Sequence, residues 1–420
     1  MSRYKFNLKP LTPYFFGGNK TFDDATNSKK ITNYHSESLL MPQQTTIIGF
    51  LRYEVLRCLN LLGTRKTSTG WDKAIGQRSF QLCGTNSFGN ITRISPVFIS
   101  NGSNYYLPAP LEYYQDDKYN VGATKNIYRM AAQLNAANEG GVNALDILEN
   151  VLNREISGVL NGEAYTGKND RINLFVHHTG KVVKLAVKDI NVEFVHLNTE
   201  TINLNTEPIN LNTETINLNE EPIFIPVTRV GNKKSINIKI DAMQGNFFMQ
   251  TYYQLSEGFQ FTFFAELDLP ENKQLKGGIV KMGGEQSVFK LEVTKIPEEQ
   301  NIESNTFEGI FTKDTFEAGS AINATRVILT SDSIVTKELL DNLQFANCDY
   351  STFNYIAGNN QVANYAQLNG NRKKMENDIF TMQRGSVLYP KDITRFVNDF
   401  DEYSKKYNYK SIGFNHFIIC

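Results

Sequence analysis

The stretch that decides the fold is LLMPQQTTIIGFLRYEVLR, from Leu39 to Arg57, in which a polar turn leads directly into an amphipathic segment. Pro42 disfavours helix before it. Apolar residues then recur at helical spacing, at Ile47, Ile48, Leu51, Val55, Cys58, Leu59 and Leu62. This periodicity predicts a helix over residues 46–62 with one face in a core, and Thr45 or Thr46 is predicted to be its N-cap.

Gly49 lies inside the predicted helix, where glycine lowers helix stability by roughly 1 kcal/mol relative to alanine. Its presence indicates that a backbone or a ligand approaches the helix closely. Free N–H groups at the start of the helix, together with Gln43, Gln44 and Arg52, would form a surface that can receive an anion. Two explanations of Gly49 stay open here: close approach of the backbone of a ligand and packing of the helix on a sheet.

The whole chain has the composition of a globular protein. Its 420 residues are 40% hydrophobic and 12% aromatic, which is sufficient for a large core and predicts two domains. No apolar run is long enough to span a membrane, and the first residues alternate as in a strand, so we predict a cytoplasmic location and no membrane partner. The four cysteines are far apart, which predicts buried thiols and neither disulfides nor a zinc site.

The formal net charge of −1 argues against nucleic-acid binding by bulk electrostatics alone. However, five of the 44 acidic residues lie in 197–224, which contains no lysine or arginine; the remaining 39 face 43 basic residues, a net charge of +4. The same segment repeats every seven residues, from Leu197, Leu204, Leu211 and Leu218. Its prolines exclude a coiled coil, so we interpret it as an insertion within an exposed loop.

The remainder alternates between strands and helices of modest length, which predicts an α+β fold with a boundary near residues 225–230. Strands are predicted at 4–8, 91–100, 105–114, 182–194, 288–294, 307–311, 325–329 and 411–419, and 247–255 and 259–267 are predicted to form a strand pair. Ser331, Asp332 and Ser333 are predicted to cap a helix that extends to Leu343, and a last helix follows Pro390.

Four glycine-bearing loops accompany the opening helix: FFGGNKTF at 15–22, VKMGGEQSVF at 280–289, QRGSVLY at 383–389 and SIGFNHFII at 411–419. Glycine allows backbone N–H groups to approach an anion, and Lys20, Lys281 or Arg384 would add positive charge beside a phosphate. Any one of these loops is also explained as a tight turn between strands. Together they favour a site that follows an RNA backbone.

Other kinds of site find little support in the sequence. There is no GxxxxGK[ST] or GxGxxG motif, and no histidine has metal-ligand spacing, so neither a cofactor nor a metal is predicted. His35, in NYHSES, could serve as a general acid or base in RNA cleavage. It has no identifiable catalytic partner, however, and a hydrogen bond from His35 to a phosphate is the preferred interpretation.

In their order along the chain, these motifs resemble the third subunit of Cmr-type (type III-B) CRISPR effector complexes, in the Cas five-like group of the RAMP superfamily. That family typically shows F-G-D-G-R-P-F, P-P-P-S-T-x-x-G-A-L-R, L-G-G-E-G-R and A-G-S-V-Y. The corresponding residues here are Phe16–Phe22, Pro42–Arg52, Met282–Ser287 and Arg384–Tyr389, and the run from Asn246 is similar to an aromatic strand pair of the family.

The motifs also depart from the family pattern. Lys20 replaces an arginine, and Gln43 and Gln44 replace prolines. Gln286 and Ser287 stand where the family often has Gly-Arg. The last change removes a guanidinium, a role that Lys281 or Lys290 could take over.

The resemblance implies two ferredoxin-like (RRM-like) domains: residues 1–226, which include the repeat insertion 197–224, and residues 227–420. It further implies a non-catalytic, RNA-binding subunit for antiviral defence that holds the repeat-derived 5′ tag of the crRNA. Its implied protein partners are the Cas ten-type large subunit and the backbone RAMP subunit, whose filament it would cap. The predicted RNA-binding residues are Gly17, Gly18, Asn19, Lys20, His35, Gln43, Gln44, Thr45, Thr46, Arg52, Lys281, Gly283, Gly284, Gln286, Ser287, Arg384, Gly385 and Ser386.

Two alternatives remain. The first is a Cas six-like RAMP endoribonuclease that processes precursor crRNA with His35 or a tyrosine. The second is the equivalent scaffold subunit of a type III-D or type I complex, which would differ in its assembly partners and not in its chemistry.

Overall fold

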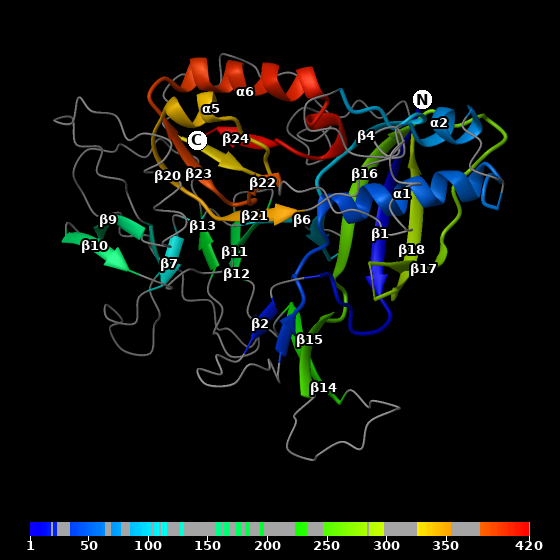
Figure 1. Cartoon of the computed structure of the whole chain (residues 1–420), viewed down its shortest axis with the longest axis horizontal. Coiled ribbons are helices and arrows are strands. Elements are labelled where there is room, and N and C mark those ends of the chain that lie inside the picture. Colours follow the sequence, from blue (N-terminus) through cyan, green and yellow to red (C-terminus); the bar gives the residue numbers. More distant parts are fainter. Residues whose placement is uncertain are drawn as a thin grey trace, which may run out of the picture.

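The computed structural model describes residues 1–17, 20–22, 34–63, 69–76, 85–101, 105–108, 111, 113–115, 127–129, 156–160, 163–167, 174–177, 181–184, 194–196, 223–232, 247–283, 285–297, 326–353 and 379–419. Helices and mainly antiparallel sheets are combined, so the α+β class is confirmed. Figure 1 shows a main sheet covered by α1 and α2, a second sheet covered by α5 and α6, and a smaller sheet that extends away from both.

The main sheet is built around the N-terminal strand. β1 (Ser2–Pro10) lies between β16 (Gln260–Leu267) and β18 (Ser287–Ile296), and β17 (Gly278–Met282) follows β18 at the edge. The sheet continues beyond β16 through β5 (Phe98–Ser100), β6 (Tyr105–Pro108), β11 (Leu174–His177), β12 (Lys181–Lys184) and β13 (Phe194–His196), and β4 (Ile91–Ile94) also pairs with β16.

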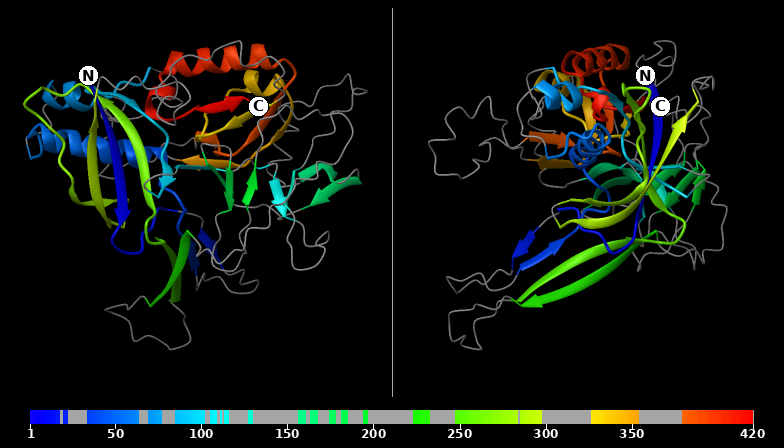
Figure 2. Two further views of the ribbon diagram at one scale, coloured as in Figure 1. Left: turned by 180° about the vertical axis from the view of Figure 1, so that it is seen from behind. Right: turned by 90° about the vertical axis from the view of Figure 1, so that its right-hand side faces the viewer.

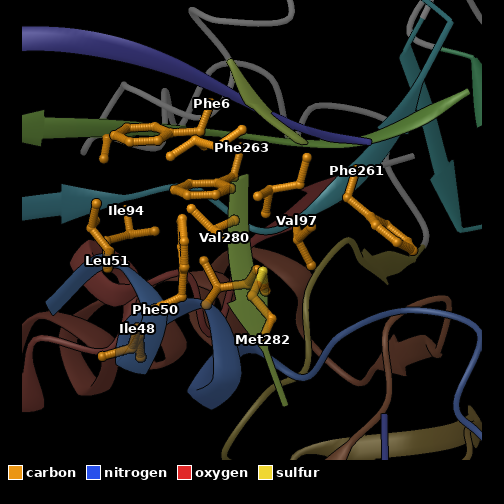
Figure 3. Packing of buried hydrophobic residues seen from close by; sticks show 14 of the residues in the cluster. Phe6, Ile48, Phe50, Leu51, Ile94, Val97, Phe261, Phe263, Val280 and Met282 are labelled. Atoms are coloured by element: carbon orange, nitrogen blue, oxygen red, sulfur yellow. The ribbon is translucent and has the colours of Figure 1, made fainter. Parts of the chain in front are cut away.

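Alternation along β1 determines which face of this sheet is covered. Tyr4, Phe6 and Leu8 are buried, as predicted, and the ring of Phe6 stacks on that of Phe263 at a centroid distance of 4.7 Å. The helices α1 (Gln44–Cys58) and α2 (Thr69–Ile75) belong to the same core. Figure 3 shows Leu51 and Phe50 of α1 directed toward the Phe6–Phe263 pair.

The predicted core face of α1 is confirmed except at Leu62, which is exposed and lies beyond the end of the helix at Cys58; the predicted start is also wrong. Ile47, Ile48, Leu51 and Val55 are buried, and Cys58 and Leu59 pack against the core from half-buried positions. The helix begins at Gln44, with extended Gln43 as N-cap. The prediction of Thr45 or Thr46 as N-cap is wrong, because the carbonyl of Gln43 already accepts the N–H groups of Thr46 and Ile47.

A smaller sheet has the order β14 (Phe224–Asn232), β15 (Phe247–Leu255), β3 (Tyr34–Glu37) and β2 (Lys20–Phe22). Only β15 and β3 are parallel within it. Figure 2 shows the long β14–β15 hairpin pointing away from the helices.

Strands β15 and β16 do not pair with each other, so the predicted strand pair is wrong. β15 belongs to the small sheet and β16 to the main sheet. A turn closed by the bond from Phe259 N to Ser256 O (3.2 Å) separates them. β16 is buried on both faces over Phe261–Ala265, which favours its central position between β1 and β5.

The third sheet contains the C-terminal part of the chain, in the order β20 (Leu343–Asn347), β23 (Val387–Pro390), β19 (Val327–Leu329) and β24 (Phe417–Ile419). The predicted helix after Pro390 is α6 (Ile393–Tyr407), with Asp392 as N-cap. Phe396 and Phe400 of α6 are buried in this core together with Leu339 and Leu340 of α5 (Lys337–Asp341).

Two predicted elements of this region are shorter than expected. α5 starts after Thr336 and not at Ser331, because Ser331 Oγ instead accepts the N–H of His416. The predicted closing strand 411–419 is reduced to β24, because Lys410–Ile412 form a 3-10 turn that ends at Gly413.

The predicted boundary between residues 226 and 227 falls inside β14, and it would separate β1 from both β16 and β18. The division into two domains and their ferredoxin-like topology stay predictions. The repeat over 197–222 and the predicted strand 307–311 lie outside the described residues.

Three short pairs complete the described fold: β7 (Tyr113–Gln115) with β8 (Ile127–Arg129), β9 (Ile156–Leu160) with β10 (Glu163–Gly167), and β21 (Tyr350–Phe353) with β22 (Ile379–Met382).

None of the helices in the described ranges combines the length and hydropathy that crossing a lipid bilayer requires.

Candidate nucleic-acid interface

The first glycine loop and the 282–287 hairpin, far apart in sequence, are in direct contact. The backbone N–H of Phe15 donates to Ser287 Oγ at 3.0 Å. Gly283 has φ +75, and a Cβ at this position would lie 3.3 Å from Phe15 O. Gly283 therefore provides both a left-handed backbone and room for the chain at Phe15.

Ser38 fixes the next residue of the same loop. Its hydroxyl accepts the N–H of Phe16 at 2.8 Å, and Leu39 N donates to Phe16 O at 2.9 Å. Two serine hydroxyls thus hold the backbone immediately before exposed Gly17. Ser38 is not among the residues predicted from the sequence, because a serine before a turn gives no pattern that identifies its distant partner.

Lys20 and His35 lie on paired strands of the small sheet. In the β2–β3 register, Lys20 is opposite Ser36 and Thr21 is opposite His35. The His35 ring is half-buried, with Nε2 3.0 Å from Thr251 Oγ1. The structure therefore brings these two predicted RNA-binding positions to one end of the small sheet.

Glu37 and Tyr253 form a further polar contact in this sheet that sequence reasoning missed. The Tyr253 hydroxyl donates to the Glu37 carboxylate. Burial, and then this bond to Glu37, raise the pKa of Tyr253 above its usual range. The Tyr253 hydroxyl therefore stays protonated and acts as a hydrogen-bond donor.

The 282–287 hairpin exposes a strained residue, and the strand before it exposes a cation. Lys281 is exposed on edge strand β17, opposite Val288. Gln286 is exposed and has φ +56, a region that glycine enters more easily, which accounts for the glycine found here in the family motif. The predicted site residues Gly18, Asn19 and Gly284 lie outside the described part of the chain.

A second group of predicted residues lies at the start of α1. Gln44 is buried, and its Nε2 donates to Ser95 O at 3.1 Å and to Ile412 O at 3.0 Å. This amide joins α1 to two other segments. Any contact of the Gln44 side chain with RNA stays a prediction.

The other predicted residues of α1 are more accessible. Gln43, Thr45, Thr46 and Arg52 are half-buried, and Arg52 Cζ lies 5.6 Å from the centroid of the Phe88 ring. Gly49 is exposed, and a Cβ there would meet no atom within 4 Å. Packing of the helix on the sheet therefore does not explain Gly49.

Arg384 is paired inside the protein. Its Nε and Nη2 bind Asp332 Oδ1 and Oδ2, each at 3.2 Å, and Nη1 donates to Val97 O at 3.1 Å. The two side chains are only 14% and 16% exposed. The carboxylate offsets the charge that was predicted to face a phosphate, and binding of RNA by Arg384 stays a prediction.

The rest of the 383–386 turn is also held by internal bonds. Gly385 N donates to Leu329 O at 2.6 Å, and Ser386 Oγ donates to Gln383 O at 2.6 Å. These bonds account for the turn itself, and contact of Gly385 and Ser386 with RNA is likewise a prediction. Over the described ranges, no three His, Cys, Asp or Glu side chains are grouped so that they could hold a metal ion.

Comparison with protein families identifies the class of protein to which this arrangement belongs. The family profile described as CRISPR-associated protein (Cas_Cmr3) matches residues 6–161 and 193–420. The chain is thus a CRISPR-associated protein. Within that class it belongs to the Cas_Cmr3 family, which confirms the resemblance inferred from the motifs. The comparison with individually curated proteins gave no match.

The solved structures that match this chain include two from type III CRISPR systems. A chain of the cryo-EM structure of the type III-B Cmr-beta bound to cognate target RNA is 14% identical, with a TM-score of 0.44, over 99% of this chain and 96% of that one. A chain of the crystal structure of the Csm3-Csm4 subcomplex of a type III-A interference complex is 12% identical, with a TM-score of 0.30, over 93% and 94% of the two chains.

Proposed function

We propose that this chain is a non-catalytic subunit of a type III-B CRISPR effector complex that binds the repeat-derived 5′ tag of the crRNA. The observation that carries the proposal is the contact between the 15–17 loop and the 282–287 hairpin, made by Phe15 N and Ser287 Oγ. The two glycine-bearing segments are thereby held against each other, and β2, which starts with Lys20, follows the first of them along the chain. Such a surface suits a single-stranded RNA backbone.

The proposal includes an end position in the complex. The subunit would cap the filament of backbone RAMP subunits and contact the Cas ten-type large subunit. Family membership supports an assembly of this kind.

The decisive experiment is to express the chain with its genomic neighbours, purify the complex and sequence the RNA that co-purifies. RNAs that share one repeat-derived 5′ end are expected. A complex without such RNAs would rule the proposal out. The proteins that co-purify would also distinguish a type III-B complex from a type III-D or type I complex.

His35 motivates the test of the endoribonuclease alternative. The purified chain, without metal, is expected to leave a repeat RNA uncut, and His35→Ala is expected to behave identically. Cleavage that disappears in His35→Ala would support the nuclease and overturn the non-catalytic assignment.

A further inference from the structure

Three side chains, those of Phe15, Tyr252 and Arg229, contact one another in series between the first glycine loop and the surface of the small sheet. The buried ring of Phe15 lies 5.2 Å from the ring of Tyr252 on β15. On the other side, Arg229 of β14 places its Cζ 4.5 Å from the centroid of the Tyr252 ring. Phe15 is buried, Tyr252 is half-buried and Arg229 is exposed. The series thus ends in an accessible guanidinium.

Strand register places Arg229 in line with Lys20. Lys20 is opposite Ser36, Ser36 is opposite Gln250, and Gln250 is opposite Arg229. One row therefore crosses all four strands, with a cationic residue at each end and no acidic residue between them. The Tyr252 hydroxyl donates to Gln250 Oε1 at 3.2 Å, which orients the ring beside this row.

We propose that Arg229, supported by Tyr252, is a stacking site for one unpaired base of a bound RNA. This inference rests on the function proposed above. A guanidinium is planar, and its face away from Tyr252 is accessible because Arg229 is exposed. Unpaired RNA bases stack on arginine planes and aromatic rings, and neighbouring cations bind the phosphates.

Two observations favour RNA over a purely structural cation–π contact. The series starts at Phe15, whose backbone forms part of the proposed tag site through Ser287. The row through Gln250 also has a cationic residue on each edge strand of the sheet, as a polyanion crossing the strands would require.

The test measures how tightly the full-length chain binds a synthetic tag RNA, with Arg229→Ala and Arg229→Lys beside the unmodified protein. Arg229→Ala is expected to weaken binding about tenfold, the effect of losing one stacked base. Arg229→Lys keeps the charge without the plane and is expected to recover only a minor part of the loss. Arg395→Ala, which removes a 70%-exposed arginine on α6, is the matched control and should bind normally.

An abasic scan of the same RNA identifies the base. Removing one particular base should weaken binding by the unmodified protein about tenfold and leave binding by Arg229→Ala unchanged, because both changes remove the same contact. Unchanged binding by Arg229→Ala, full recovery with Arg229→Lys, or additive effects at every position would each overturn the proposal.

Two further outcomes separate this inference from the function on which it rests. If the unmodified chain and its complex retain no tag RNA, both proposals fail. If Arg229→Ala keeps the RNA but loses a protein partner from the purified complex, the stacking site is refuted and the proposed function stands.

Discussion

The amide group of Gln44 occupies the space that a side chain on Gly413 would need. A Cβ on Gly413 would lie 2.0 Å from Gln44 Nε2 and 2.9 Å from Ser95 O, and Gly413 has φ +86. Glycine is thus required at position 413 for its conformation and for its size. The contact joins the first residue of α1 to the loop before β24.

Gly413→Ala is therefore expected to lower the free energy of unfolding by about 3 kcal/mol, since about 1–2 kcal/mol comes from the left-handed backbone and the rest from overpacking. Chemical denaturation measures this loss. Gly258→Ala is the matched control, because Gly258 has the same φ of +86 and open space around it. Gly258→Ala should lose only the conformational part, and equal losses in the two variants would contradict the role of Gln44.

The Arg384–Asp332 pair is expected to stabilise the fold. Arg384→Ala leaves a largely buried carboxylate unpaired and should reduce the free energy of unfolding by about 2–3 kcal/mol, less than for a fully buried pair. Asp332→Ala should have a similar effect, and the double variant should lose about 1–3 kcal/mol less than the sum. Normal stability with loss of RNA in Arg384→Ala would instead support the phosphate contact predicted from sequence.

Replacing Gln286 by glycine is expected to stabilise the protein. A non-glycine residue at φ +56 is strained, and glycine relieves this strain. The free energy gained in this way exceeds the loss that comes from the greater entropy of glycine in the unfolded chain. The expected increase in the free energy of unfolding is about 0.5–1 kcal/mol. Gln286→Ala, which keeps the strain, should show no gain; an equal gain from alanine would argue against backbone strain as the cause.

His416 is expected to make stability depend on pH. Burial, and then the charge of Lys410, lower the pKa of His416 to about 3, while its Nε2 lies 2.8 Å from the carbonyl oxygen of Lys410. Between this value and the ordinary pKa near 6.5, the unfolded chain binds a proton that the folded chain does not. The free energy of unfolding should therefore fall as the pH decreases below about 6.5, by up to about 1.4 kcal/mol per pH unit. Above about pH 6.5, titration of His416 should have no effect on it.

His416→Gln, which is neutral throughout, provides the comparison. The free energy of unfolding is measured from pH 7 to pH 5, before most carboxylates titrate. The difference between the unmodified protein and His416→Gln should change with pH in that range. A constant difference would show that His416 does not titrate as its burial implies.

Charge at the first glycine loop is expected to matter more for RNA than the repeat does. Lys20→Glu should weaken retention of RNA and make it more sensitive to salt, because a phosphate contact is replaced by repulsion. Deletion of residues 197–222, which leaves the buried Ile223 and Phe224 in place, should have a smaller effect. RNA recovered with the purified complex measures both, and equal losses would contradict the assignment of the 15–22 loop.

Local patterns predicted part of this structure well. The buried face of α1 and the alternation of β1 follow from periodicity within the segment, and both are confirmed. The family resemblance inferred from the motifs is also confirmed.

The errors have a common physical cause. Ser331 looked like a helix cap, but its hydroxyl binds His416, which is distant in sequence. β15 and β16 looked like a pair, but each has a better partner elsewhere, β16 in β1. The stacked position of Arg229 depends on the register of β14 with β15, which no local pattern determines.

The position of β1 in the middle of the main sheet has a consequence for biosynthesis. Both of its neighbours, β16 and β18, lie beyond residue 259, so β1 leaves the ribosome long before either can pair with it. At ordinary translation rates this wait lasts on the order of tens of seconds. Lys5 and Lys9 alternate with its apolar residues, and such charges discourage an unpaired strand from joining other chains while the main sheet is still incomplete.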